Sequence, residues 1–150
     1  MLLLTATSPD DAAELATFLS GVDLTTAGLD DPAVRLWVQR DAAGALVAST
    51  GFELSANGRH ALIRSVAVDP ARRSKGRGSE LATFALDRAR ESGAVTAWLF
   101  SRRSGPFWQK LGFEPADRDA LAGALADSHQ VRAFTESGQL AREVAWSRSL

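Results

Sequence analysis

The chain has 150 residues, of which 45% are hydrophobic and 23% charged, a composition typical of one globular domain with a sizeable core. Its formal net charge of −1 argues against a surface built mainly to hold nucleic acid. It contains no cysteine, which excludes disulfides, thiolate nucleophiles and Cys-ligated metals. The two histidines, His60 and His129, lack the spacing of metal ligands, so we expect no metal site.

No targeting or membrane-spanning signal is visible in the sequence. The opening stretch "MLLLTATSPDD" has only three leucines in a row and no basic residues before them, unlike a signal peptide. No apolar run approaches the length of a membrane span. We therefore expect a cytoplasmic, soluble protein with no membrane partner.

The apolar pattern predicts alternating strands and helices. After a strand at residues 2–6, Ser8 is the expected N-cap of a helix, with Pro9 at its first position. Residues 21–33 are polar and rich in turn formers, and predict no regular element. Further strands are expected over 34–40, 45–54, 60–68, 94–100 and 142–150, and helices over 78–92, 104–112 and 117–127. The helix between strands 60–68 and 94–100 makes a parallel crossover, which predicts a mixed α/β sheet.

The stretch "PARRSKGRGSEL" at residues 70–81 places four cations directly before the helix of 78–92: Arg72, Arg73, Lys75 and Arg77. The first turn of a helix carries unpaired N–H groups and a partial positive charge, so cations are unfavourable there. A bound anion would reverse that cost, because the helix start and the cations would then surround it. The alternative is a plain turn whose cations are solvated.

Glycines make the anion hypothesis specific. Gly76 and Gly78 let backbone N–H groups approach an anion without a Cβ in the way. A dinucleotide fingerprint fails because its third glycine position holds Leu81. A Walker loop fails because Gly78 is followed by Ser79 and Glu80 instead of Lys and Ser/Thr. A pyrophosphate cradle of another kind and the plain turn both remain open at this point.

The stretch "SVAVDPARRSKGRGSELATFALDRA", followed by "FWQKLGF", resembles the GNAT superfamily of acetyl-CoA-dependent N-acetyltransferases. Its [Arg/Gln]-x-x-Gly-x-[Gly/Ala] signature is met by Arg73, Gly76 and Gly78. The resemblance implies one domain over 1–150 with a mixed, largely antiparallel sheet flanked by helices. Its parallel central strands would splay around the cofactor. It also implies acetyl-CoA as the acetyl donor.

The resemblance further implies which residues bind the cofactor. The backbone of the basic loop would hold the pyrophosphate of coenzyme A, namely Arg73, Ser74, Lys75, Gly76, Arg77, Gly78 and Ser79. Val66, Ala67 and Val68 would pair with the pantetheine arm as an added strand does. The N–H of Val66 would face the thioester carbonyl, as a donor aimed at developing negative charge.

Two positions depart from the family pattern. Trp108 stands where these enzymes often carry the tyrosine that protonates the leaving thiolate, and the whole chain has no tyrosine. Ser101 stands where an asparagine is frequent. Trp108 can pack against the cofactor, and proton delivery would fall to water or to Ser101.

The predicted hairpin at Asn57-Gly58 gives a hypothesis for where the amine that accepts the acetyl group binds. A two-residue turn places Glu53 opposite Leu62, with Arg64 as its diagonal neighbour. One interpretation is a structural ion pair. The other makes Glu53 a general base acting through water, with Arg64 and its neighbour Ser65 holding a substrate carboxylate. On the second interpretation, Glu53→Gln lowers turnover more than acetyl-CoA affinity.

Within the superfamily, "LIRSVAV" and "LFSRRSGPFWQKLGFEPADRDAL" are most similar to arsenic-resistance N-acetyltransferases and to the acetyltransferase domain of N-acetylglutamate synthase. These relatives act on small amino-acid-like amines, which implies a small-molecule amine as substrate. Arg102 could contact an acidic substrate or be a solvated loop cation. A non-catalytic acyl-CoA-binding regulatory domain is the alternative function. We expect no nucleic-acid partner, and we leave room for a homodimer.

Overall fold

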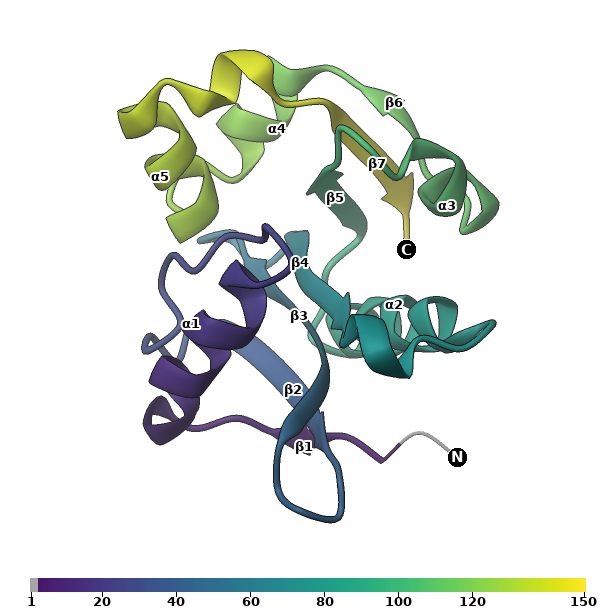
Figure 1. The fold of residues 1–150 in the computed structure, drawn as a ribbon. Coiled ribbons are helices and arrows are strands. Elements are labelled where there is room, and N and C mark those ends of the chain that lie inside the picture. The colour runs from purple at the N-terminus through teal and green to yellow at the C-terminus, as the bar shows by residue number, and fades with distance from the viewer. Residues whose placement is uncertain (1–2) are drawn as a thin grey trace.

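The computed structural model describes residues 3–150 as a seven-stranded sheet in the order β1-β2-β3-β4-β5-β7-β6 (Figure 1). The strands are Thr5–Ala6 (β1), Val34–Arg40 (β2), Leu46–Leu54 (β3), His60–Val68 (β4), Thr96–Phe100 (β5), Glu114–Ala116 (β6) and Ala145–Ser149 (β7). The helices are Ala12–Ser20 (α1), Arg77–Glu91 (α2), Gly105–Lys110 (α3), Arg118–Ala124 (α4) and His129–Ser137 (α5). No helix within residues 3–150 is long and apolar enough to cross a membrane.

The topology confirms the expected mixed, largely antiparallel sheet. β4 and β5 run parallel through the α2 crossover, and every other neighbouring pair is antiparallel. The predicted first strand is reduced to Thr5–Ala6, and position 2 of that prediction lies outside the described residues. The first helix begins as a 3₁₀ turn at Pro9–Asp11, where the Ser8 N–H donates to the Asp11 carboxylate at 2.8 Å.

The β3–β4 hairpin has the predicted register on a longer turn. Glu53 lies opposite Leu62, as expected from the sequence. The chain turns over four residues instead of two, because the Gly58 N–H donates to the Ser55 carbonyl at 2.9 Å. Gly58 has a φ of +72°, a conformation that glycine adopts without strain.

β4 contains a bulge that the sequence pattern did not reveal. Ala67 pairs with Ser49 and Arg64 pairs with Gly51. Between these two pairs β4 has two residues and β3 has one, so β4 contains one extra residue. Before the bulge, Ile63 packs on the α2 side of the sheet; after it, Val66 does so. The extra residue thus reverses which side chains face each side, at the middle of the longest buried strand pair.

Helices cover both faces of the sheet, α2 and α3 on one and α1, α4 and α5 on the other (Figure 1). The α2 face buries the largest cluster, which includes Phe52, Leu86, Leu99 and Phe113. The hydroxyl of Thr50 donates to the Leu81 carbonyl at 2.7 Å inside this layer, which fixes α2 on β3. The sequence did not predict β6 or α5, and α5 supplies part of the site described next.

Candidate active site

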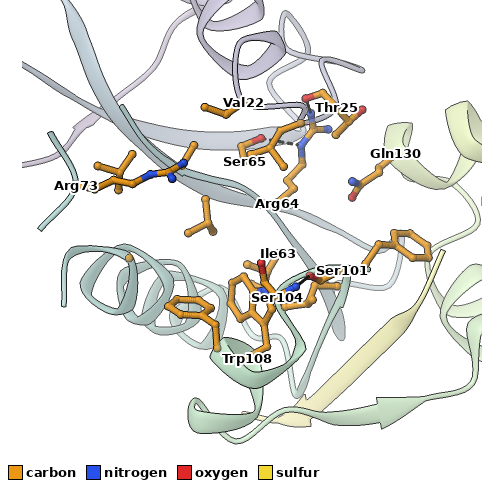
Figure 2. A pocket seen from close by; sticks show the side chains of 18 of the residues that line it. Val22, Thr25, Ile63, Arg64, Ser65, Arg73, Ser101, Ser104, Trp108 and Gln130 are labelled. Carbon is orange, nitrogen blue, oxygen red and sulfur yellow. Dashed lines mark hydrogen bonds between the residues drawn. The ribbon is translucent and has the colours of Figure 1, made fainter. Parts of the chain in front are cut away.

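A cleft opens where the two parallel strands separate. β4 pairs with β5 only over His60–Leu62, so the later β4 residues have no partner on that side. The cleft, called here the strand cleft, has a volume of about 480 Å³ (Figure 2). It is lined by Ile63–Val68 of β4, by Leu99–Ser101, Ser104, Phe107 and Trp108 opposite, by Arg73, Ser74 and Gly78 at one end and by Val22, Leu24, Thr25 and Gln130 at the other.

The basic loop forms one end of the strand cleft, and its amides are free. Gly76 is the N-cap of α2 with φ +86°, which turns the chain sharply into the helix. Within residues 3–150, the structure gives no hydrogen-bond acceptor to the N–H groups of Ser74, Lys75, Gly76, Gly78 and Ser79. Unpaired amides clustered at a helix start are suited to binding an anion.

The loop cations divide into two groups. Arg72 is paired with Asp41 at 2.8 Å and thus has a structural partner. In the described part of the chain, Arg73, Lys75 and Arg77 have no carboxylate within 4.0 Å. Arg73, Ser74 and Gly78 line one end of the cleft, and Lys75 and Arg77 belong to the same loop. Free amides and unpaired cations in one loop are suited to binding an anion.

The β4 bulge presents backbone to the middle of the cleft. Ser65 has a φ of +61°, a strained conformation for a residue with a side chain. It is held there by the buried Ser49 hydroxyl, which donates to the Ser65 carbonyl at 2.6 Å, and by Arg64 Nε, which donates to Ser65 Oγ at 3.2 Å. Ser65 and Val66 have no paired residue in β3. Val66, Ala67 and Val68 all line the cleft.

Ser101 and Trp108 form the opposite wall (Figure 2). Ser101 Oγ accepts the Ser104 N–H at 3.1 Å, which leaves the hydroxyl hydrogen free to donate into the cleft. The Trp108 ring is buried, in edge-on contact with Phe107 and Phe113 at centroid distances of 4.9 and 5.4 Å. It thus serves as an apolar wall.

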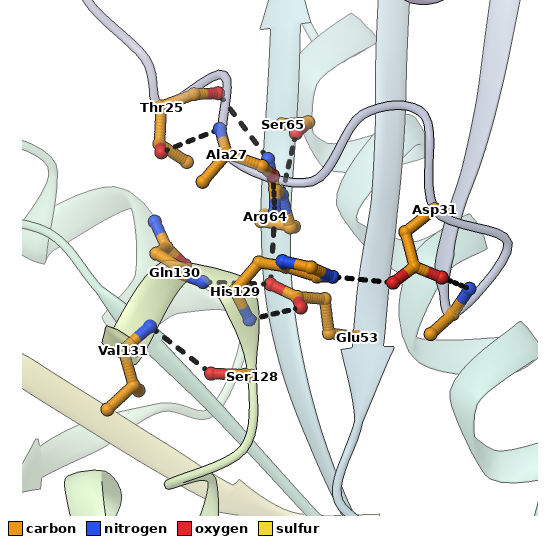
Figure 3. Close-up of polar contacts among 11 residues, drawn as sticks. Thr25, Ala27, Asp31, Glu53, Arg64, Ser65, Ser128, His129, Gln130 and Val131 are labelled. Atoms are coloured by element: carbon orange, nitrogen blue, oxygen red, sulfur yellow. Dashed lines mark hydrogen bonds and ion pairs between the residues drawn. The ribbon is translucent and has the colours of Figure 1, made fainter. Parts of the chain in front are cut away.

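Glu53 and Arg64 form a buried ion pair, with 3.0 Å between Arg64 Nη1 and Glu53 Oε2 (Figure 3). Their side chains are 3% and 0% exposed. Arg64 also donates to the carbonyls of Ala27, at 2.7 Å, and Thr25. Burial lowers the pKa of Arg64 below its ordinary value, and the Glu53 carboxylate opposes that shift.

The same carboxylate caps a helix. Glu53 Oε1 accepts the His129 N–H at 2.7 Å and Oε2 accepts the Gln130 N–H at 3.3 Å, both at the start of α5. The His129 ring in turn contacts Asp31 at 2.7 Å. The pair therefore joins β3 and β4 to the loop of residues 21–33 and to α5.

This geometry favours the structural interpretation of Glu53 and Arg64. Both Glu53 oxygens already accept hydrogen bonds within the protein, and Glu53 does not line the strand cleft. Arg64 lines the strand cleft, and four contacts within the protein hold its guanidinium. The contacts therefore support a structural ion pair more than a base at Glu53 and a substrate ligand at Arg64, and Ser65 shapes the bulge.

A second cavity of about 570 Å³, called here the lateral cavity, opens beside the strand cleft. Its lining includes Val22–Thr26, Phe100–Ser104, Gln130, Ala133, Phe134, Ser137, Gln139 and Glu143. Arg102 lines it but is paired with the buried Glu143 carboxylate at 3.3 Å, to which Gln139 also donates at 2.8 Å. Thr25, Ser101 and Gln130 line both cavities, so the two spaces meet there.

Sequence reasoning missed Gln130, Ser49 and the role of the 21–33 loop. The available signal for α5 was Ser128 as an N-cap, whose side chain accepts the Val131 N–H at 3.2 Å, followed by apolar residues at 131 and 134. Nothing local in the sequence marks Ser49 as a partner of the bulge.

Comparison with known proteins identifies the family of this chain. Residues 6–113 match the model of the acetyltransferase (GNAT) family. An amino-acid acetyltransferase of Pseudomonas syringae pv. tomato is 31% identical over 83 residues, which is 55% of this chain and 19% of that protein. This chain thus spans about a fifth of the length of that relative.

Solved structures share the fold. N-acetylglutamate synthase from Neisseria gonorrhoeae, complexed with coenzyme A and N-acetyl-glutamate, superposes with a TM-score of 0.69 at 16% identity, covering 100% of this chain and 36% of that chain. A GNAT-family acetyltransferase from Staphylococcus aureus Mu50 gives a TM-score of 0.73 at 13% identity and covers 99% of both chains. The strand cleft, the basic loop and the matched residues lead to one conclusion: the chain belongs to the acetyltransferase (GNAT) family.

Proposed function

We propose that the protein transfers the acetyl group of acetyl-CoA to the primary amine of a small, amino-acid-like acceptor by direct attack. One observation carries the proposal above the others. The basic loop, with its free amides and unpaired cations, contributes Arg73, Ser74 and Gly78 to one end of a cleft that continues along the unpaired edge of β4 into a second cavity. An extended donor with a diphosphate at one end fits that shape.

The basic loop would bind the diphosphate. The amides from Ser74 to Ser79 and the start of α2 would donate to its oxygens, while Arg73, Lys75 and Arg77 would neutralise its charge. The chain from Ile63 to Val68 would pair with the pantetheine arm, because its backbone groups have no β5 partner.

The Val66 N–H would stabilise charge on the reacting carbonyl. When bound, acetyl-CoA supplies an activated acyl group whose C–S bond breaks as the N–C bond to the amine forms. Negative charge grows on the carbonyl oxygen during the attack, and a donor fixed beforehand stabilises it. The strained Ser65 and its contacts with Ser49 and Arg64 keep that donor in place.

Proton transfer in the cleft would rely on Ser101 and water. Of the residues that the structure describes, no Asp or Glu lines the strand cleft. The proton of the attacking amine would pass to water, and Ser101 Oγ–H or water would protonate the leaving thiolate. A thiolate is a good enough leaving group for such weak acid assistance.

The lateral cavity would hold the rest of the acceptor. Its lining carries two cations, Arg102 and Arg103, and two carboxylates, Asp23 and Glu143. These charges form two ion pairs, Arg102–Glu143 at 3.3 Å and Arg103–Asp23 at 4.0 Å, so the lining is polar with no net charge, which suits a zwitterion of amino-acid size. The Pseudomonas relative is named for amino-acid acetylation, and the Neisseria structure contains N-acetyl-glutamate, which supports the same class of acceptor.

The test compares two neighbouring arginines. Arg73→Ala should weaken coenzyme A binding, measured by calorimetry, on the order of tenfold, because an unpaired cation beside the diphosphate is lost. Arg72→Ala is the matched control: Arg72 belongs to the same loop but is paired with Asp41, so its loss should leave affinity nearly unchanged. Equal weakening by both variants would contradict the assignment of the loop.

Catalysis is tested separately with the wild-type protein. Acetyl-CoA is mixed with each common L-amino acid in turn, and release of the free thiol is measured. Release with at least one amine supports acetyl transfer. Saturable binding of acetyl-CoA without release for any amine would instead support a non-catalytic acyl-CoA-binding domain, the alternative raised by Trp108 in place of a tyrosine.

A further inference from the structure

We propose that Gln130 selects the acceptor: its side-chain carbonyl accepts a hydrogen bond from the amino group that is acetylated. The inference rests on the proposed function and goes further by naming a residue and a contact. It begins from an unpaired atom. Within residues 3–150, Gln130 Oε1 is one of three buried side-chain atoms with no hydrogen-bond partner, the others being Gln39 Oε1 and Arg88 Nε.

The fold has no use for the Gln130 carboxamide. Its backbone N–H caps α5 by donating to Glu53, a contact that any residue except proline could make. The apolar contacts of α5 come from Val131 and Phe134. The Gln130 residue is 8% exposed, and its Oε1 is removed from water without a hydrogen bond to replace it. An unpaired buried acceptor destabilises a fold. Gln39 and Arg88 line neither cavity, whereas Gln130 lines both, so the unpaired Gln130 oxygen points to a ligand.

The position of Gln130 identifies which part of the ligand it meets. Gln130 lines both cavities, at the place where the strand cleft joins the lateral cavity. Figure 2 shows its side chain among those that line the strand cleft. The reacting amine must reach the thioester from that junction, while the body of the acceptor occupies the lateral cavity. Ser101 and Thr25 line the junction too and complete a polar neck.

The Gln130 carboxamide at the neck is neutral, which suits an amine that must lose a proton before it attacks. A carboxylate there would favour the ammonium form, which cannot attack. The nearest acidic group on this side, Glu53, is neutralised by Arg64 and turned toward α5. A carboxamide oxygen accepts an N–H without adding charge, so it orients the amine and leaves deprotonation possible.

The experiment replaces the carboxamide by an apolar chain of similar length, Gln130→Met. The acceptor is whichever common L-amino acid gives the fastest thiol release with the wild-type protein. We expect the KM for that amine to rise about tenfold or more, with the KM for acetyl-CoA unchanged. We expect the Tm to stay level or rise by about 2–4 °C, because an unpaired buried group is removed.

Gln39→Met is the matched control. Gln39 lies on β2, lines neither cavity and carries the same kind of unpaired buried oxygen. It should show the same neutral or raised Tm with an unchanged KM for the amine. A second variant, Gln130→Glu, should move the pH profile of kcat/KM to higher pH, because its carboxylate favours the protonated amine.

Each outcome decides the matter. An unchanged amine KM in Gln130→Met, or an unmoved pH profile in Gln130→Glu, would overturn the role of Gln130 while leaving acetyl transfer intact. A Tm several degrees lower in Gln130→Met would assign the carboxamide to the fold and overturn the role as well. If the wild-type protein binds acetyl-CoA but releases thiol with no amine, the proposed function fails, and the Gln130 contact fails with it.

Discussion

Replacing Glu53 by glutamine should destabilise the fold much more than it slows any chemistry. The substitution keeps the side-chain size but removes the charge that balances Arg64 and caps α5. The guanidinium would then be a buried cation with no counterion. One of the two carboxylate oxygens that accept the His129 and Gln130 amides would become a donor group facing other donors.

The magnitude follows from the burial of the pair. Arg64 and Glu53 side chains are 0% and 3% exposed, so solvent screening does not discount their interaction. Two unit charges about 4 Å apart interact by about 4 kcal/mol at an effective dielectric constant of about 20. Breaking a buried pair by removing one partner costs about 3–5 kcal/mol. For a chain of this length that corresponds to a Tm lowered by about 6–20 °C.

Thermal unfolding followed by circular dichroism measures the effect. Glu14→Gln is the control: the Glu14–Arg40 pair, with 2.8 Å between its atoms, is exposed at 47% and 34%, so its loss should change stability by less than about 1 kcal/mol. In Glu53→Gln/Arg64→Met the unpaired cation is gone, so stability should recover in part. A Glu53→Gln variant with the wild-type Tm but thiol release reduced a hundredfold would refute this reasoning and restore Glu53 as the base.

Two further variants test the bulge and the response to acid. Ser49→Ala removes the 2.6 Å bond to the Ser65 carbonyl, which should cost about 1–3 kcal/mol and lower kcat while leaving coenzyme A affinity unchanged; an unchanged kcat would contradict the positioning role. Asp41 has a pKa lowered from 3.8, chiefly by the backbone N–H of Ala45 and further by that of Ala43 and by Arg72. Its contribution to stability is thus present above pH 3.8 and is lost as the pH falls through the lower folded pKa. Asp41→Asn should make the fall of Tm below pH 3.8 shallower, and parallel Tm curves for the two proteins would count against this.

The elements with strong local patterns were predicted closely. β2 and β4 have the predicted bounds, and α2 begins one residue earlier and ends one residue earlier than expected. Alternating apolar residues and the Asn57-Gly58 turn are local signals, so they can be read from the sequence without knowledge of the fold. β6 has three residues and contains Pro115, and such a short edge strand carries no periodicity to read.

In the candidate site, too, features built from consecutive residues were predicted, and features built from distant residues were not. The basic loop could be recognised because its glycines, cations and helix start are consecutive in the chain. The Glu53–Arg64 contact was expected from the hairpin register, but its role was not. The donor that occupies Glu53 Oε1 lies 76 residues away at His129, and the Arg64 acceptors lie 37 and 39 residues away. These contacts turn a candidate base into a structural link.

The sequence by itself determined the hairpin register and most of the strands and helices, β6 and α5 excepted, since short-range periodicity decides these features. It also predicted an anion site at residues 73–79 from the glycines, the cations and the helix start. Only the tertiary structure decided that Ser65 carries the bulge, that Glu53 caps α5 and that Gln130 stands at the neck between two cavities. Each depends on which distant segments pack together, and burial then decides whether a charge is free to react or is neutralised by its neighbours.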